Sequence, residues 1–254
     1  MGTAGTQSLG LEDGRAVVLA YFADEPGLED RLRDALGALP VEIVPTTIPE
    51  VDWVARVREG FRPFSAGRFR IVPAWEASVA ARGSERMIVV EPGLAFGTGT
   101  HESTRLCLAA LEERARAGPL GHVLDVGAGS GILSVAATQL GARRVIAIEL
   151  DEEALPVARR HAELNRAPIR LVRGDGARAV AAGAFDVVVA NLSAPLLAER
   201  VEELAGTTRG RGALILSGFL VEGLPSLRAA YAAVGDIDVR VEGEWAALVV
   251  HRGP

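Results

Sequence analysis

The chain has 254 residues, of which 49% are hydrophobic and 24% charged, as is typical of a soluble globular protein, and no apolar run reaches the roughly 18 residues of a membrane helix. The net charge of −6 gives no electrostatic footprint for nucleic acid and is compatible with a basic protein partner. The single cysteine, Cys107, excludes an internal disulfide, and no secretory signal is recognisable, so we expect a cytoplasmic protein.

Residues 1–49 predict a small N-terminal α+β unit. The first ten residues are rich in glycine, serine and threonine, and we expect them to be disordered. A strand is predicted at 15–22, an amphipathic helix at 27–39 and a second strand at 41–47. This β-α-β unit is too small for a robust core of its own, so we expect it to lean on its neighbour.

Residues 50–67 predict a linker helix that ends in a hinge. The apolar residues that recur at helical spacing are Trp53, Val54 and Val57. Pro63 and Gly67 then break the helical pattern. We therefore expect the hinge between Phe61 and Gly67.

Residues 68–254 predict a doubly wound α/β domain. Two short strands are expected within 68–75 and 86–92. Apolar strands at 122–126, 144–150, 169–175, 185–191 and 212–218 then alternate with helices at 132–140, 152–165 and 194–206. Such alternation is typical of a mostly parallel, Rossmann-like sheet with helices on both faces. Residues 237–252 hold two strands joined by Glu-Gly-Glu and predict an antiparallel edge.

A stretch rich in glycine and threonine, EPGLAFGTGTHEST, occupies residues 91–104. It resembles a phosphate loop, but Thr100, His101 and Glu102 stand where such a loop has its lysine, which disfavours a triphosphate. One histidine beside one glutamate, with no second pair at ligand spacing, also leaves a metal site incomplete. The sequence therefore predicts no metal, and a neutral or zwitterionic ligand against this bare backbone.

A second glycine motif, GAGSG, lies where the predicted strand 122–126 turns into a helix. Gly127, Gly129 and Gly131 let the backbone approach a ligand, and the helix N-terminus offers free N–H groups. The spacing G-x-G-x-G, with Asp125 before it, differs from the dinucleotide spacing G-x-G-x-x-G and favours a methionine-derived nucleoside. By itself, such a turn can also serve packing alone.

Polar residues follow the next three predicted strands. Glu149 ends the second strand, 22 residues after Gly127, where an acid can accept hydrogen bonds from both ribose hydroxyls of a nucleoside. Asp175 follows the third strand, either beside an adenine edge or in a plain Asp-Gly turn. Asn191 stands at the mouth of the fourth, purely apolar strand, a position that often carries function.

These motifs together resemble one family. DWVARVREGFRP, EPGLAFGTGTHEST, LDVGAGSGIL, IELDEEAL, VVVANL and GEW follow one another in this order, and the chain from about residue 50 to its end is similar to the ribosomal protein L11 methyltransferases. The resemblance implies a class I methyltransferase fold with S-adenosylmethionine as cofactor. It also implies N-methylation of amino groups of ribosomal protein L11, at lysine side chains, the N-terminal amine or both.

The resemblance also implies roles for individual residues. The implied cofactor contacts are Thr104, Gly127, Glu149 and Asn191, with Phe96, Gly97 and Thr98 in a loop over the methionine portion. Family members commonly have aspartate at the position of Glu149, which should retain ribose binding. The N-terminal unit would recognise the substrate, but it is shorter than is usual for the family. Relatives that lack this unit act on other proteins, so a different protein or a small amine stays an alternative acceptor.

Methyl transfer to an amine is an in-line displacement, so the main task of the protein is alignment. A lysine amine has to lose its proton on entering the site, helped by desolvation and a nearby positive charge. We expect the side-chain oxygen of Asn191 and the backbone carbonyl of Leu192 to orient the amine. Ser103 and Thr104 are expected to cap the following helix. His101 is either a base or a residue that orders the loop or the helix N-terminus.

Two readings of other classes remain. A non-catalytic cofactor-binding module would keep the glycine motifs without the chemistry, but the intact Asn191 and glycine stretch argue against it. A nicotinamide dehydrogenase is disfavoured by the glycine spacing and by the absence of a convincing Lys/Tyr or His/Arg catalytic set.

Overall fold

The computed structural model describes residues 5–12, 15–23, 25–37, 39–46, 61–77, 86–92, 101–178 and 180–253. The chain divides into two compact units, Met1–Val51 and Asp52–Pro254. Most of the predicted linker helix lies outside the described residues, so the domain boundaries and the hinge stay predictions. Among the helices of the described ranges, none is both long and apolar enough to cross a membrane.

The described residues of the first unit form a two-stranded antiparallel sheet and one helix. Strand β1 (Gly5–Glu12) pairs with β2 (Arg15–Tyr21), and helix α1 (Leu28–Leu36) follows. The predicted β-α-β order is therefore wrong, because residues 5–10 form part of a strand and residues 41–46 are irregular.

Two local signals account for this difference. Glu12 pairs with Arg15 across the dipeptide Asp13-Gly14, which is among the strongest short signals for a hairpin. The segment 41–46 contains Pro45, which has no N–H to donate to a strand ladder. The apolar pattern of 41–46 thus does not suffice for a strand.

The second unit is built on a seven-stranded sheet in the order β11-β12-β10-β9-β6-β7-β8. Its strands are β6 (His122–Val126), β7 (Arg144–Glu149), β8 (Ile169–Arg173), β9 (Phe185–Asn191), β10 (Thr208–Leu220), β11 (Gly235–Glu242) and β12 (Trp245–Arg252). Strands β6 to β10 are parallel, and β12 runs antiparallel to both β10 and β11. The predicted mostly parallel sheet with an antiparallel C-terminal hairpin is confirmed.

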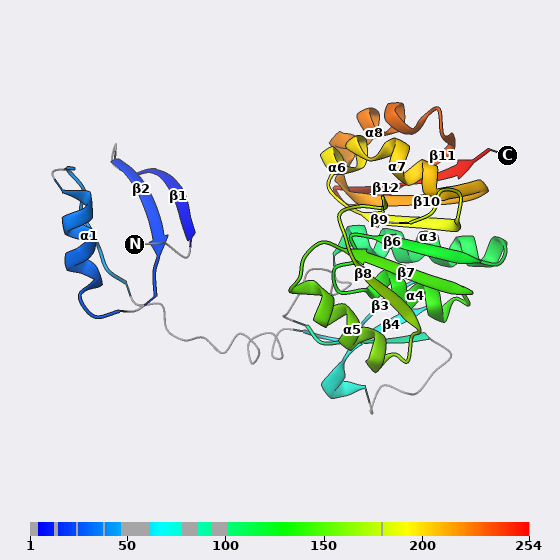
Figure 1. The fold of residues 1–254 in the computed structure, drawn as a ribbon, viewed down its shortest axis with the longest axis horizontal. Helices are drawn as coiled ribbons and strands as arrows, with labels where there is room; N and C mark the ends of the chain where they lie inside the picture. Colours follow the sequence, from blue (N-terminus) through cyan, green and yellow to red (C-terminus); the bar gives the residue numbers. More distant parts are fainter. Residues whose placement is uncertain are drawn as a thin grey trace. The chain divides into compact units, whose positions relative to one another are not determined.

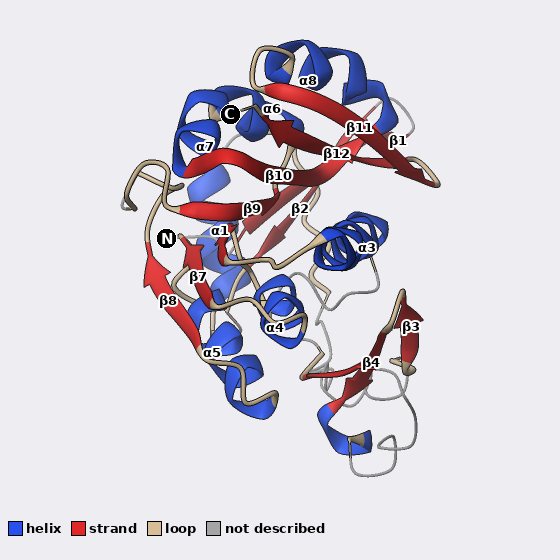
Figure 2. Ribbon diagram, turned by 90° about the vertical axis from the view of Figure 1, so that its right-hand side faces the viewer, coloured by secondary structure: helices blue, strands red, loops and turns tan. Residues whose placement is uncertain are grey.

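Helices cover both faces of this sheet, as Figures 1 and 2 show. On one face lie α3 (Glu102–Ala117), α4 (Ile132–Gln139) and α5 (Ala154–Leu164). On the other lie α6 (Ala194–Glu199), α7 (Val201–Thr207) and α8 (Leu224–Tyr231). Alternate residues of one strand enter different cores, so Val187 and Val189 pack with α3 and α4, whereas Val188 packs with α6 to α8.

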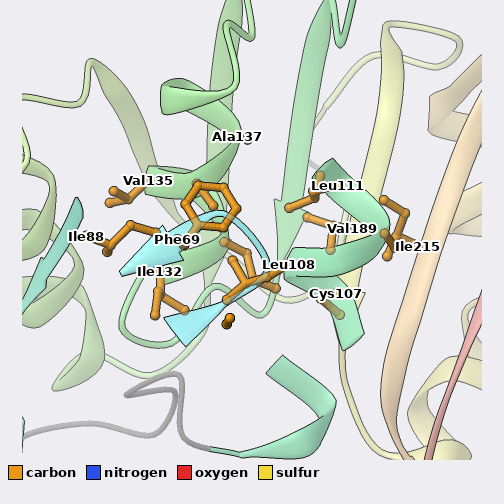
Figure 3. Close-up of a cluster of buried hydrophobic side chains, with 14 of the residues drawn as sticks. Phe69, Ile88, Cys107, Leu108, Leu111, Ile132, Val135, Ala137, Val189 and Ile215 are labelled. Atoms are coloured by element: carbon orange, nitrogen blue, oxygen red, sulfur yellow. The ribbon is translucent and has the colours of Figure 1, made fainter. Parts of the chain in front are cut away.

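A small second sheet completes the core on the α3 and α4 face. It consists of β3 (Phe64–Ala66), β4 (Phe69–Pro73) and β5 (Arg86–Val90), with β5 parallel to β4. Figure 3 shows Phe69 of β4 and Ile88 of β5 beside Ile132 and Val135 of α4. The chain therefore leaves β5, towards residues 91–104, from a strand that is anchored in the core.

Helix 194–206 was predicted as one element, but the structure divides it at Arg200. This residue has φ −101° and ψ 16°, and its side chain pairs with Asp175 and Glu203. Helix α8, which was not predicted, begins with Pro225 in its first turn. Two short 3-10 turns, Ala74–Glu76 and Val221–Gly223, connect further elements.

The two-faced core predicts unequal costs for two leucines of β10. Leu214 is fully buried, whereas Leu220 is 40% exposed on the same strand. Leu214→Ala should lower the free energy of unfolding by about 2–5 kcal/mol and Leu220→Ala by less than about 1 kcal/mol. Urea denaturation of both variants checks this, and equal losses would contradict the assignment of Leu214 to the core.

Candidate active site

Four of the predicted site residues lie at the carboxyl edge of the parallel strands. Asp125 is the second-last residue of β6, Glu149 ends β7, Asn191 ends β9, and Asp175 follows β8 by two residues. Because β9, β6, β7 and β8 are neighbours and run the same way, their ends meet at one edge. The strand order reverses direction around β6, and ligands of doubly wound sheets bind at such a point.

The turn after β6 needs its glycines. Gly127, Gly129 and Gly131 have φ of 72°, 51° and 75°, in the left-handed region that favours glycine. The amides of Gly127 and Ala128 both donate to the carbonyl of Ile148, at 2.9 and 3.0 Å. A Cβ on Gly127 would collide with the side chain of Leu192. The turn is therefore fixed against both neighbouring strand ends.

Glu149 is held by two backbone amides. Its Oε2 accepts from Gly129 N at 2.7 Å and its Oε1 accepts from Asp151 N at 2.8 Å. Each carboxylate oxygen has a second lone pair, so both remain able to accept a further hydrogen bond. The side chain is thus oriented at the edge before any ligand arrives. Its predicted contact with a ribose stays a prediction.

Asp125 is buried beneath the turn, with 1% of its surface exposed. Ser134 of α4 donates its hydroxyl to Oδ2 at 2.7 Å, whereas Oδ1 has no hydrogen-bond partner among the described residues. Burial raises the pKa of Asp125 to about 6, against the lowering effect of the Ser134 hydrogen bonds. Asp125 therefore supports the turn from below, and its predicted contact with the cofactor stays a prediction.

Asn191 is oriented by α3. Its Nδ2 donates to the hydroxyl of Thr104 at 3.3 Å, while its Oδ1 is buried without a hydrogen-bond partner within the described part of the chain. A buried amide oxygen without a partner is costly and calls for an explanation. The structure thus brings Asn191 and Thr104 together and leaves one acceptor available.

The neighbouring strand β10 comes very close to this amide. At Gly218, which has φ 94°, a Cβ would lie 2.5 Å from the carbonyl oxygen of Leu192 and 2.8 Å from Oδ1 of Asn191. Leu192 N also donates to Ser217 O at 2.9 Å. Gly218 was not among the predicted site residues, although GALILSG ends on it. Only a residue without a side chain fits beside these two oxygens.

The N-terminus of α3 is capped by His101, and the prediction that Ser103 and Thr104 are the caps is wrong. His101 Nδ1 accepts from Ser103 N at 3.3 Å and lies 2.8 Å from the Ser103 hydroxyl. Its ring meets Trp245 of β12 edge to face, with centroids 4.2 Å apart. The structure therefore shows the helix N-terminal role of His101, and a role as base stays a prediction.

Asp175 forms an ion pair with Arg200 and is 65% exposed in its side chain. Gly176, which follows it, has φ 68°, and the amide of Ala177 donates to Glu203. These contacts tie the Asp-Gly turn after β8 to the break between α6 and α7. A contact of Asp175 with an adenine edge stays a prediction.

The sequence analysis missed His161 of α5, which contacts the glycine turn and the residue after β5, and Asn165, the C-cap of α5, which binds β5. His161 contacts Ser130 and Glu91, and Asn165 accepts from Val89 N and donates to Val89 O, both at 2.7 Å. Their signal is the spacing i, i+4 of two polar residues on an otherwise apolar helix face. Phe96, Gly97 and Thr98 lie outside the described residues. Within the described ranges, no group of three metal-binding side chains is present.

Comparison with known proteins identifies the family to which this chain belongs. The family model described as "Ribosomal protein L11 methyltransferase (PrmA)" matches residues 9–253. The chain belongs to this family. A member from Geobacter sulfurreducens is 41% identical over 253 residues, which cover 92% of this chain and 81% of the relative. One from Geobacter metallireducens is 38% identical over 255 residues, which cover 93% and 82%.

Solved structures agree with the family assignment. The ribosomal protein L11 methylase from Lactobacillus delbrueckii subsp. bulgaricus superposes with a TM-score of 0.69 at 34% identity, over 76% of this chain and 100% of that one. A 16S rRNA methyltransferase of T. thermophilus, with a TM-score of 0.53 at 24% identity, shares the fold alone. The chain is therefore a methyltransferase, and the predicted class I methyltransferase fold and the family resemblance are confirmed.

The buried Asp125 predicts an unusual dependence of stability on pH. Because its pKa in the folded protein lies near 6, above the ordinary value of 3.8, the folded state binds more protons than the unfolded state between pH 4 and 6. This group therefore stabilises the fold at low pH, and its contribution is lost as the pH rises through 6. The shift corresponds to about 3 kcal/mol.

Asp125→Asn removes the titration. The free energy of unfolding of this variant minus that of the wild type should rise by about 2 kcal/mol between pH 4 and 6, the larger part of the full shift. Urea denaturation of both proteins across this range measures the difference, in which the other carboxylates cancel. Parallel curves would show that Asp125 titrates normally.

Proposed function

We propose that the chain is an S-adenosylmethionine-dependent N-methyltransferase that methylates amino groups of a protein, with ribosomal protein L11 as the expected acceptor. The acceptor amines are lysine side chains, the N-terminal amine or both. The names of the relatives support the choice of L11. A ribosomal acceptor would place the enzyme in the cytoplasm.

The observation that carries the proposal is the pair of oxygens beside Gly218. Oδ1 of Asn191 is buried without a hydrogen-bond partner among the described residues, and the carbonyl of Leu192 faces the same glycine. Two acceptors and no donor suit a neutral primary amine, which has hydrogens to donate. A carboxylate or phosphate would be repelled by the same pair.

The strand ends fit the cofactor. Glu149 has lone pairs for the ribose hydroxyls, and the glycine turn offers bare backbone beside it. The residues that would hold S-adenosylmethionine are Phe96, Gly97, Thr98, Thr104, Asp125, Gly127, Gly129, Glu149, Asp175 and Asn191. When bound, the cofactor supplies a methyl group on a positively charged sulfur.

The residues of the chain act on the amine. A lysine amine has an ordinary pKa of about 10.4, and moving it from water into the site lowers that pKa, so its proton leaves to solvent. Asn191 Oδ1 and the Leu192 carbonyl then accept the remaining hydrogens, which points the nitrogen lone pair away from them. Thr104 keeps the amide in this orientation, since it accepts from Asn191 Nδ2. Alignment of this kind supplies much of the rate of a displacement.

We assign recognition of the acceptor protein to residues 1–49. This unit exposes apolar side chains, with Val18 58% and Val44 74% exposed, as expected of a surface that binds a partner. The alternative acceptors are another protein and a small amine.

The decisive experiment is methyl transfer to purified ribosomal protein L11, read by intact mass. With the wild type, the mass of L11 should increase by about 14 Da, one CH₂, for each methyl group transferred. Asn191→Ala should lower the rate of transfer at least about 100-fold, because the amine loses an oriented acceptor. Binding of S-adenosylhomocysteine, the demethylated cofactor, should remain measurable in this variant by calorimetry.

Three outcomes would change the proposal. Transfer to another protein but not to L11 would replace the acceptor and keep the chemistry. Cofactor binding without transfer to any amine would favour a non-catalytic module. An unchanged rate in Asn191→Ala would remove the role of this residue.

Gly218 gives a second, independent prediction. Gly218→Ala places a methyl group against Asn191 Oδ1 and the Leu192 carbonyl, and we expect the rate of transfer to fall by at least about 100-fold, as for a displaced catalytic group. Gly243→Ala is the matched control, because Gly243 also has a left-handed φ, of 60°, but nothing within 4 Å of its Cβ position. That control should cost about 1 kcal/mol of stability and leave the rate unchanged. Equal rates in both variants would contradict the steric argument.

A further inference from the structure

His161 joins two segments that are far apart in the sequence. It lies on α5 with 1% of its surface exposed. Its Nδ1 is 2.8 Å from the carbonyl oxygen of Ser130, and its Nε2 accepts a hydrogen bond from Glu91 N at 2.8 Å. Ser130 belongs to the glycine turn after β6, and Glu91 is the first residue after β5.

These partners determine the protonation of the ring. The Glu91 amide can only donate, so Nε2 carries no proton, and the Ser130 carbonyl can only accept, so Nδ1 carries one. The ring is therefore neutral and satisfied at both nitrogens. Burial lowers the pKa of His161, against hydrogen bonds that act in the opposite direction, which favours this neutral form.

The same helix face also touches the turn directly. A Cβ on Gly131 would lie 3.3 Å from Cβ of Ala158, one turn before His161 on α5. Residue 131 is thus packed against α5 and residue 130 is hydrogen-bonded to it. Helix α5 therefore positions Ser130 and Gly131 of the turn.

Asn165, four residues after His161, makes a different connection. Its Oδ1 accepts from Val89 N and its Nδ2 donates to Val89 O within β5. Among the described residues, its side chain has no hydrogen bond to the glycine turn. It also donates to the carbonyl of His161 at 2.7 Å. Asn165 therefore attaches α5 to β5, whereas His161 attaches the chain leaving β5 to the glycine turn.

We propose that His161 is a positioning residue for cofactor binding, which fixes the glycine turn at Ser130 relative to Glu91, where the glycine-rich stretch 91–104 begins. The inference rests on the proposed function, in which the glycine turn after β6 contributes to binding S-adenosylmethionine. Among the described residues, the hydrogen bonds of His161 go to Ser130, Glu91 and Asn165 and not to Asn191. Substitution of His161 should therefore weaken cofactor binding and leave kcat, the rate at saturating cofactor, almost unchanged.

Calorimetry with S-adenosylhomocysteine and steady-state kinetics test this. His161→Leu fills a similar volume without polar atoms and leaves the Glu91 amide and the Ser130 carbonyl unpaired. We expect the Kd and the KM for the cofactor to rise about tenfold, with kcat within about twofold, as when binding is lost equally in the ground and transition states. His161→Gln, whose amide oxygen can reach the position of Nε2, should restore the Kd to within about threefold of the wild type.

Asn165→Leu is the control for a general loosening of α5. It should lower Tm as His161→Leu does but leave the Kd unchanged. If His161→Leu does not fold, His161→Asn takes its place, because its side chain is too short to reach Glu91. The expected order of affinity is then wild type, His161→Gln, His161→Asn.

Two results would overturn the inference. One is wild-type affinity in both His161→Gln and His161→Leu, or His161→Asn where the leucine variant does not fold. The other is a loss of affinity in Asn165→Leu as large as that in the His161 variant that cannot bind Glu91. Failure of the wild type itself to bind S-adenosylhomocysteine would instead refute the proposed function.

Discussion

The positions of the strand ends at the candidate site depend on the turn formed by residues 127–131. Its backbone is hydrogen-bonded to Ile148 and Glu149 of β7, lies against Leu192 after β9, and contacts α5 at Ser130 and Gly131. Its path depends on Gly127, Gly129 and Gly131, which take left-handed conformations that glycine adopts without strain. The turn therefore fixes the relative positions of three strand ends. Glu149 and Leu192, two residues of the candidate site, both lie against this turn.

The two oxygens that lie beside Gly218 bear on the chemistry that we propose for the site. The two oxygens beside Gly218 belong to an amide and a peptide, and both are neutral. A carboxylate there would stabilise the protonated amine, which has no lone pair to attack with. In the function that we propose, a neutral acceptor pair instead favours the free base. Glu149 stands at the end of a different strand, β7, separated from β9 by β6, whereas the buried Asp125 lies on β6 itself.

Much of the fold follows from local patterns in the sequence. The central parallel strands β6 and β9 are almost continuous apolar runs because both of their faces are buried, and the last hairpin is marked by Glu242-Gly243-Glu244. The N-terminal unit was harder, because the alternation of 41–46 resembles a strand more closely than that of 5–10 does. Strand pairing is decided by a partner, which a single segment does not reveal.

The candidate site was predictable where a side chain follows a strand, as for Glu149 and Asn191. It was not predictable where function lies in an approach between elements. Gly218 is one of many glycines until its distance from Leu192 is known. His161 is marked by its spacing to Asn165, but its two backbone partners carry no sequence signal. A helix N-terminal role was one of the two alternatives for His101, but the capping itself was assigned to Ser103 and Thr104, because serine and threonine are commoner N-caps than histidine.

The strand order has a consequence for the behaviour of the protein in solution. Because β12 is inserted between β10 and β11, the sheet ends on β11 at one side and on β8 at the other. Both outer strands carry exposed charges, Asp236 and Asp238 on β11 and Arg170 and Arg173 on β8. Charged side chains on an outer strand oppose the addition of a foreign strand to its free backbone groups. The doubly wound sheet is in this way protected against edge-to-edge aggregation.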